Sequence, residues 1–133
     1  MLIRKEMANI EIYNIANALL EVFNEDVHLP VKVNFYLQKN IGRMVEMAKD
    51  IDKARMEIVR KYGEPLEEDP NQFKIDPEKV DDANKEIQDL FSLKQEVKIN
   101  TILLEAFDDV DLTSQQVGAI MFMIQDDEEE DKE

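Results

Sequence analysis

The chain has 133 residues, a formal net charge of −15 and no cysteine. This length fits one domain that buries a modest core of its own. The absence of cysteine excludes disulfides, thiolate metal sites and a cysteine nucleophile. The hydrophobic fraction of 44% is too high for a wholly disordered chain, so we expect one helix-rich folded domain over residues 1–125.

Acidic residues gather at the end of the sequence. Residues 126–133 hold seven acids and one lysine, a net charge of −6, which leaves −9 for residues 1–125. We predict an acidic disordered tail over 126–133. The negative charge argues against direct nucleic-acid binding and favours a partner with a basic surface. Solubility alone explains the acidity equally well.

The first predicted helix covers residues 10–23, with Asn9 as its N-cap. Its apolar side chains recur at steps of three and four residues: Ile12, Ile15, Ala16, Leu19, Leu20 and Phe23. Residues 31–37 then alternate apolar and polar side chains, and this period of two predicts a strand. The alternative is that the following helix already starts at Pro30, because proline is favoured at the first helical position.

Residues 38–62 form the longest predicted helix, which Gly63 and Pro65 terminate. Its apolar stripe comprises Ile41, Met44, Val45, Ala48, Ile51, Ile58 and Val59. At roughly 1.5 Å per residue the helix spans about 37 Å, long enough to project from so small a domain. Its net charge of +3 on an acidic protein calls for an acidic neighbouring element.

Residues 64–75 combine two prolines with four acids and predict a mobile acidic loop. A third helix follows, with Asp76 as its cap and Pro77 at its first position. The segment 76–96 carries a charge of −4, which complements the long helix. The two helices are therefore expected to form a long antiparallel hairpin.

A second strand is predicted over residues 97–103, from the alternation of Val97, Ile99, Thr101 and Leu103 with polar residues. It would pair antiparallel with residues 31–37 in a small two-stranded sheet. In the last helix Thr113 is the expected N-cap and Gln116 its capping-box partner, with Val117, Ile120, Met121 and Ile124 buried. The predicted fold is α+β and mainly helical, with about four helices.

Four segments carry a resemblance to a known family. They are IYNIANALL, LPVKVNFYLQKNI, MEIVRKYGEP and the closing apolar helix. The chain resembles a family of small phage and prophage proteins of low-GC Gram-positive bacteria, which is catalogued as a domain of unknown function. The resemblance implies a viral origin and expression in the bacterial cytoplasm. No motif in it is diagnostic of a reaction, so it implies no functional residue.

No residue pattern predicts catalysis. The single histidine, His28, stands beside Leu29 and Pro30 without a second ligand or an HExxH spacing, so a structural or solvent-facing role is favoured. Asp108, Asp109 and Asp111 lack the glycine and the last glutamate of a calcium-binding loop, and at most weak cation binding follows. We therefore expect no enzyme activity, no cofactor and no metal site.

The favoured hypothesis is a noncatalytic phage-encoded factor that binds a host or phage protein. An acidic surface could inhibit a host defence or DNA-handling protein by presenting carboxylates where phosphates would lie. The candidate partner-binding residues are Glu67, Glu68, Asp81, Asp82, Asp89, Asp126, Asp127 and Glu128 to Glu130.

Two alternatives remain open. One is a virion structural or assembly protein, for which methionine-rich apolar surfaces and self-association into a symmetric homo-oligomer would be suited. The other is a small nucleotide-signal binder, which would need a basic pocket formed by Arg43, Lys49, Lys53 or Arg55. The lack of a long apolar segment and of a signal peptide predicts a cytoplasmic protein without membrane contact.

Overall fold

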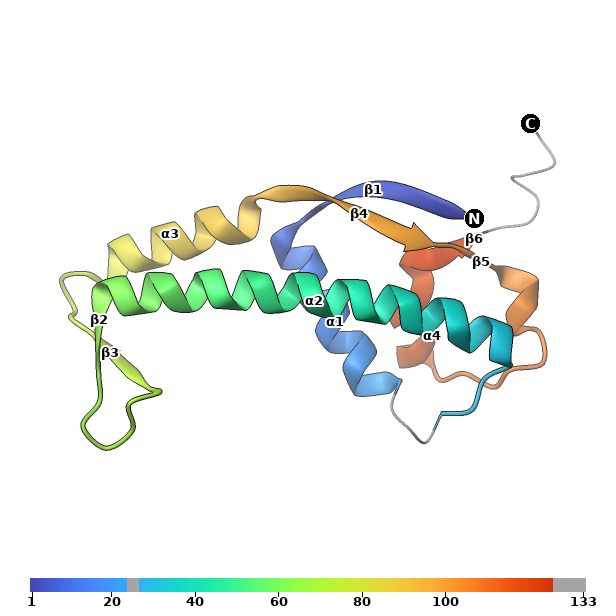
Figure 1. Cartoon of the computed structure of the whole chain (residues 1–133), viewed down its shortest axis with the longest axis horizontal. Helices are drawn as coiled ribbons and strands as arrows, with labels where there is room; N and C mark the ends of the chain where they lie inside the picture. Colours follow the sequence, from blue (N-terminus) through green and yellow to red (C-terminus); the bar gives the residue numbers. More distant parts are fainter. Residues whose placement is uncertain (24–26, 126–133) are drawn as a thin grey trace.

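The computed structural model describes residues 1–23 and 27–125, and it shows an α+β fold dominated by helices (Figure 1). No described helix is both long and apolar enough to cross a membrane. The elements are, in chain order, β1 (Leu2–Ala8), α1 (Asn9–Val22), α2 (Val31–Tyr62), β2 (Gly63–Pro65), β3 (Phe73–Ile75), α3 (Val80–Ser92), β4 (Lys94–Asn100), β5 (Ile102–Leu103), η1 (Leu104–Phe107), α4 (Ser114–Ile120), η2 (Met121–Met123) and β6 (Ile124–Gln125).

Helix α2 begins at Val31, so the strand predicted over residues 31–37 is wrong and the alternative of an early helix start is correct. Pro30 is the N-cap residue, and its carbonyl accepts the Asn34 N–H at 2.9 Å. Val33 and Leu37 are buried one helical turn apart, whereas the side chain of Phe35 is 55% exposed. The alternation was thus also compatible with a helix, because every fourth residue of it faces the core.

The sheet that covers this core is a two-stranded ribbon of β1 and β4. Leu2 lies opposite Asn100 and Ala8 opposite Lys94 in an antiparallel register. The expected strand near residues 97–103 is therefore present as β4, but its predicted pairing with residues 31–37 is wrong. Its partner is β1, to which the sequence analysis assigned no structure. Two short pairs complete the strands, β2 with β3 antiparallel and β5 with β6 parallel.

The hydrophobic core lies between α1, the first half of α2, α4 and the β1–β4 ribbon. Its largest fully buried side chains are Met7, Ile12, Leu19, Leu37, Met44, Val97, Ile99, Ile120 and Met123. Asn40 on α2 is buried among them and ties the helix to the ribbon. Its side-chain amide accepts the backbone N–H of Asn100 and donates to the carbonyl of the same residue, both at 2.8 Å.

The second half of α2, the β2–β3 hairpin and the start of α3 extend away from this core as an arm (Figure 1). We define the arm as residues 52–82, a stretch in which no residue is buried. The predicted antiparallel hairpin of α2 and α3 is confirmed. Helix α3 starts at Val80, later than predicted, because Asp76 and Pro77 belong to a turn. In that turn the Asp76 carbonyl accepts the Lys79 N–H, and its carboxylate accepts the Glu78 N–H.

The two other predicted N-caps, Asn9 and Thr113, can also be compared with the structure. Thr113 caps α4 as predicted: its hydroxyl accepts the Gln116 N–H at 3.1 Å, and Gln116 reaches back to the Thr113 N–H. At α1 the cap is Ala8, and Asn9 is instead buried, donating to the Leu90 carbonyl. The predicted buried face of the last helix is only partly right. Ile120 is buried, but Val117 and Met121 are exposed and Met123 is buried in their place.

Candidate partner-binding surface

The end of the arm concentrates negative charge. Residues 64–82 hold eight acids and two lysines, a net charge of −6 in a short segment. We call this segment the acidic tip. Its apolar side chains Leu66, Phe73 and Ile75 are only half-buried and none belongs to the central core. Carboxylates beside incompletely covered apolar groups suit a partner surface that is both basic and apolar.

The backbone of the β2–β3 hairpin fixes the position of these acids. Gly63 is required where the hairpin leaves α2, because a Cβ atom there would lie 2.9 Å from the carbonyl oxygen of Val59. The Leu66 N–H donates to the Gln72 carbonyl, and the Gln72 N–H donates to the Asp69 carbonyl. These bonds close the turn and leave the side chains of Glu67 and Glu68 exposed to solvent.

A hollow of about 550 Å³ opens between this hairpin and the turn that precedes α3. Its lining residues are Tyr62, Glu64, Pro65, Leu66, Glu67, Lys74, Asp76, Pro77 and Lys79. The lining thus combines three carboxylates and two lysines with the apolar side chains of two prolines and a leucine. The hollow can receive a long side chain with an apolar stem and a cationic head, as arginine and lysine have.

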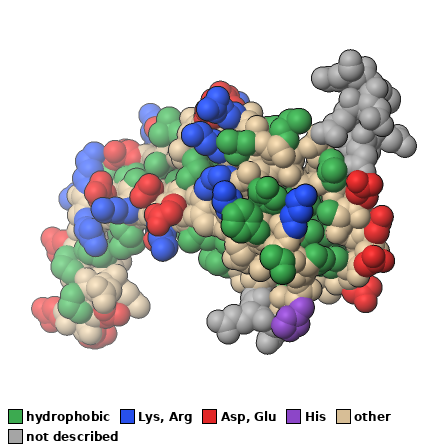
Figure 2. Space-filling model, turned by 45° about the vertical axis from the view of Figure 1, so that its right-hand side comes forward, with side chains coloured by type: hydrophobic (Ala, Val, Ile, Leu, Met, Phe, Trp, Pro, Cys, Tyr) green, Lys and Arg blue, Asp and Glu red, His purple; other side chains and the backbone are tan. Residues whose placement is uncertain are grey.

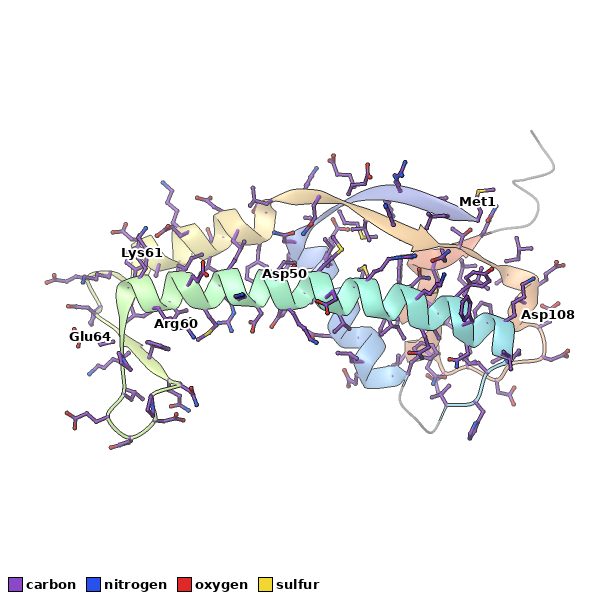
Figure 3. The ribbon with its side chains drawn as sticks, viewed as in Figure 1. Met1, Asp50, Arg60, Lys61, Glu64 and Asp108 are labelled. Atoms are coloured by element: carbon purple, nitrogen blue, oxygen red, sulfur yellow. The ribbon has the colours of Figure 1, made fainter. Side chains whose placement is uncertain are left out.

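Helices α2 and α3 are linked by polar groups next to the hollow. The Lys61 ammonium lies 3.1 Å from a carboxylate oxygen of Glu86, and the Tyr62 hydroxyl also donates to Glu86. These two donors lower the pKa of the Glu86 carboxyl, while Glu86 raises the pKa of Lys61 and of Tyr62. Figure 3 shows Lys61 on the side of α2 that faces α3, and Arg60 on the hairpin side. The guanidinium of Arg60 stands 6.0 Å from the centre of the Phe73 ring.

The acids named from the sequence are distributed over the arm. Glu67 lines the hollow, and Glu68 follows it in the loop. Asp81 and Asp82 occupy the first turn of α3, and Asp89 lies two turns further toward the body; all five side chains are exposed. Asp126, Asp127 and Glu128 to Glu130 lie outside the described residues. Sequence reasoning missed Glu64, Asp76 and Tyr62, although the prolines beside Glu64 and Asp76 already marked tight turns.

A second acidic group lies on the body, at the end opposite the arm. Figure 2 shows red side chains along this edge as well as at the arm's lower tip. Asp108, Asp109 and Asp111 are exposed there, and Figure 3 places Asp108 far from Glu64. Among the described residues, no three His, Asp or Glu side chains are placed to hold a metal ion. His28 is exposed.

The basic residues of α2 do not converge on one pocket. Arg43 donates to the Asn100 side chain, and Arg55 forms a pair with Asp52 at 2.8 Å. Lys49 lines a separate hollow between α1 and α2, together with Asp52. The arginines that a nucleotide phosphate would require are therefore held by partners within the chain.

Helices α1 and α4 enclose a more apolar hollow of about 450 Å³, away from the arm. Ile15, Ala18, Val22, Ala119 and Phe122 line it, with Glu21 and Asn14 at its edge. It holds few polar groups that could orient a small ligand. The acidic tip combines a net negative charge with a hollow, and it is therefore the stronger candidate for a binding site.

Comparison of the chain with protein-family models, curated proteins and solved structures finds no match.

Proposed function

We propose that this protein is a noncatalytic binding factor that engages a partner protein with a basic surface through the acidic tip of its arm. The observation that carries the proposal is that the arm projects without a buried residue while its end holds a net charge of −6 around a hollow. A chain gains little stability from such an extension, since folding is driven by apolar burial. An extended charged surface does suit recognition of another molecule.

The charge of the acidic tip should also increase the rate at which a basic partner binds to it. A field of one sign around a concave surface steers a partner of the opposite sign and raises the association rate. Lys74 and Lys79 at the edge of the hollow restrict where a cationic group can sit. The resemblance to phage proteins adds a context for the proposal: the partner would be a host or phage protein in the bacterial cytoplasm, such as a DNA-handling protein whose nucleic-acid groove is basic.

The test compares two charge-reversed variants in affinity capture from bacterial lysate. One variant carries Glu64→Lys, Glu67→Lys and Glu68→Lys on the tip. The matched control carries Asp108→Lys, Asp109→Lys and Asp111→Lys, which changes the net charge by the same amount on the opposite end of the molecule. We expect a protein that the wild type and the control retain and the tip variant loses.

The captured partner is then purified and its affinity for all three proteins is measured by calorimetry. Equal loss in both variants would show that binding follows net charge alone. Equal retention would show that the partner binds elsewhere, and recovery of capsid or tail components would support the assembly role in its place. Each of these results contradicts binding of a basic host protein through the acidic tip.

A further inference from the structure

The backbone N–H and C=O groups of successive residues in β1 point alternately toward β4 and away from it. The Thr101 N–H donates to the Met1 carbonyl and the Asn9 N–H to the Leu93 carbonyl, so the odd-numbered residues of β1 make the ladder bonds to β4. In an antiparallel ladder the residues between them point their N–H and C=O groups the other way. The backbone groups of Leu2, Arg4 and Glu6 therefore face away from β4.

The two outer edges of the ribbon differ. At the β4 edge the Asn40 side chain bonds both backbone groups of Asn100, and α2 packs alongside. At the β1 edge no described residue bonds the outward backbone groups of Leu2, Arg4 or Glu6. A seven-residue strand with such an edge is a template for one more strand.

The side chains on the outer face of the ribbon are poorly matched within one chain. Arg4 lies opposite Lys98, and Glu6 lies opposite Glu96. Like charges directly across a strand pair repel. One diagonal contact offsets this, between Arg4 Nε and Glu96 Oε1 at 3.4 Å. The side of Arg4 and Glu6 away from β4 has no such contact among the described residues, and both side chains are exposed.

We propose that β1 pairs antiparallel with β1 of a second copy of this chain, about a two-fold axis at Lys5, to form a four-stranded sheet. In this register Arg4 of each copy lies opposite Glu6 of the other, and Ile3 lies opposite Met7 on the inner face. Each opposite-charge pair occurs twice, as an isologous interface requires. The one like-charge pair is Lys5 with Lys5, whose long exposed side chains can separate.

Charge and backbone direction favour this register over the registers that are shifted by one or two residues. A shift by two residues would set Arg4 against Arg4 or Glu6 against Glu6. A shift by one residue would oppose backbone groups that already bond β4. Charged side chains often protect a sheet edge from pairing. Here the opposite signs of Arg4 and Glu6 on the outer face favour one self-complementary arrangement.

This interface goes beyond the proposed function, because β1 belongs to the body and the acidic tip to the arm. A dimer would carry two acidic tips and would bind a partner with paired basic sites more tightly. Either proposal can fail without the other, since one is tested by mass and the other by partner capture.

The experiment is sedimentation equilibrium across the micromolar range at moderate salt. We expect twice the mass of one chain for the wild type, and a single-chain mass for Arg4→Glu and for Glu6→Arg, each of which sets like charges opposite each other at both positions. An equimolar mixture of the two variants restores both opposite-charge pairs and should dimerise. A monomeric wild type, a monomeric mixture, or a single variant that dimerises like the wild type would overturn the proposal.

Two further variants separate the β1 edge from folding and net charge. Glu6→Pro removes an outward N–H and leaves the bonds to β4, so the protein should be monomeric with an unchanged circular dichroism spectrum. If Glu6→Pro unfolds, the mixture of Arg4→Glu with Glu6→Arg still tests whether β1 pairs with β1 of a second copy. Lys98→Glu changes the net charge as much as Arg4→Glu does, but lies on β4, so the dimer should persist. A dimer in Glu6→Pro, or its loss in Lys98→Glu, contradicts pairing through β1.

Discussion

Asn40 is the residue on which the link between α2 and the ribbon depends. It is 1% exposed, and its amide bonds the N–H and the C=O of Asn100 and contacts the sulfur of Met123. The amide takes the place of a neighbouring strand at Asn100, so the end of β4 closes against α2. A single buried side chain thus covers the Asn100 end of the β4 edge, whereas no described residue bonds the outward backbone groups of Leu2, Arg4 or Glu6 on the β1 edge.

We expect Asn40→Ala to lower the free energy of unfolding by about 2–4 kcal/mol, because it leaves two half-buried backbone groups of Asn100 unpaired. Urea denaturation of both proteins measures this difference. Asn34→Ala is the matched control, since Asn34 is an exposed asparagine on the same helix. If the two variants unfold alike, water replaces the amide at Asn100 and the interpretation is wrong.

At the scale of elements, a cluster of polar side chains joins the end of α2 to α3. Glu86 on α3 accepts from Lys61 and Tyr62 on α2, and both bonds lower its pKa from the ordinary 4.5. A carboxyl group with a lowered folded pKa stabilises the fold above its unfolded pKa, and this contribution is lost as the pH falls through the folded value. The pKa of Lys61 is raised in the fold, so this residue acts at high pH. Its contribution to stability is lost as the pH rises through the folded pKa of Lys61.

The variant Glu86→Gln should therefore be less stable than the wild type at neutral pH. The difference should shrink as the pH falls below the folded pKa of Glu86, because the wild-type side chain then becomes neutral as well. Urea denaturation over a pH series measures it, with Glu57→Gln, which changes an exposed glutamate on α2, as the control. A stability difference that stays constant with pH would assign the effect to lost packing instead of lost charge.

The elements that the sequence predicted correctly are those with long amphipathic patterns or specific caps. The α2–α3 hairpin follows from complementary charge, and the α4 start follows from Thr113 and Gln116. The N-terminal turns of α2 were predicted only as the alternative to a strand. Apolar residues at 31, 33, 35 and 37 alternate as in a strand, while Val33 and Leu37 lie one helical turn apart, and only tertiary packing distinguishes the two structures. Strand β1 was missed because Arg4, Lys5 and Glu6 interrupt its pattern. Its structure comes from pairing with β4, which lies 86 to 98 residues away in the sequence, from the pair Ala8–Lys94 to the pair Leu2–Asn100.

The acidic composition of the candidate site could be predicted from the sequence, but the shape of its hollow could not. The density of acids between residues 64 and 82 is visible in the sequence, and it includes Glu67, which lines the hollow. The hollow exists because the β2–β3 hairpin and the turn at Asp76 bring Glu64 and Asp76 to one concavity. That juxtaposition depends on hydrogen bonds between distant backbone groups, which no local pattern specifies.

At the scale of the whole molecule, net charge acts in opposite directions on the two proposed interfaces. Two copies that each carry −15 repel over long distances, whereas a basic partner is attracted to the same field. Salt screens both effects, with a screening length of about 10 Å at roughly 0.1 M. The Arg4–Glu6 pairs lie at contact distance, so screening affects them less than it affects the repulsion between whole chains.

Raising the salt concentration from very low to physiological values should therefore tighten the dimer and weaken partner binding. The dimer dissociation constant is measured by sedimentation, and the partner affinity is measured by calorimetry on the same samples. Lys98→Glu serves as the control, because its larger negative charge should make the dimer still more salt-dependent while β1 is unchanged. Parallel weakening of both interactions would show that local ion pairs, and not the net charge of the chain, dominate the association of two copies.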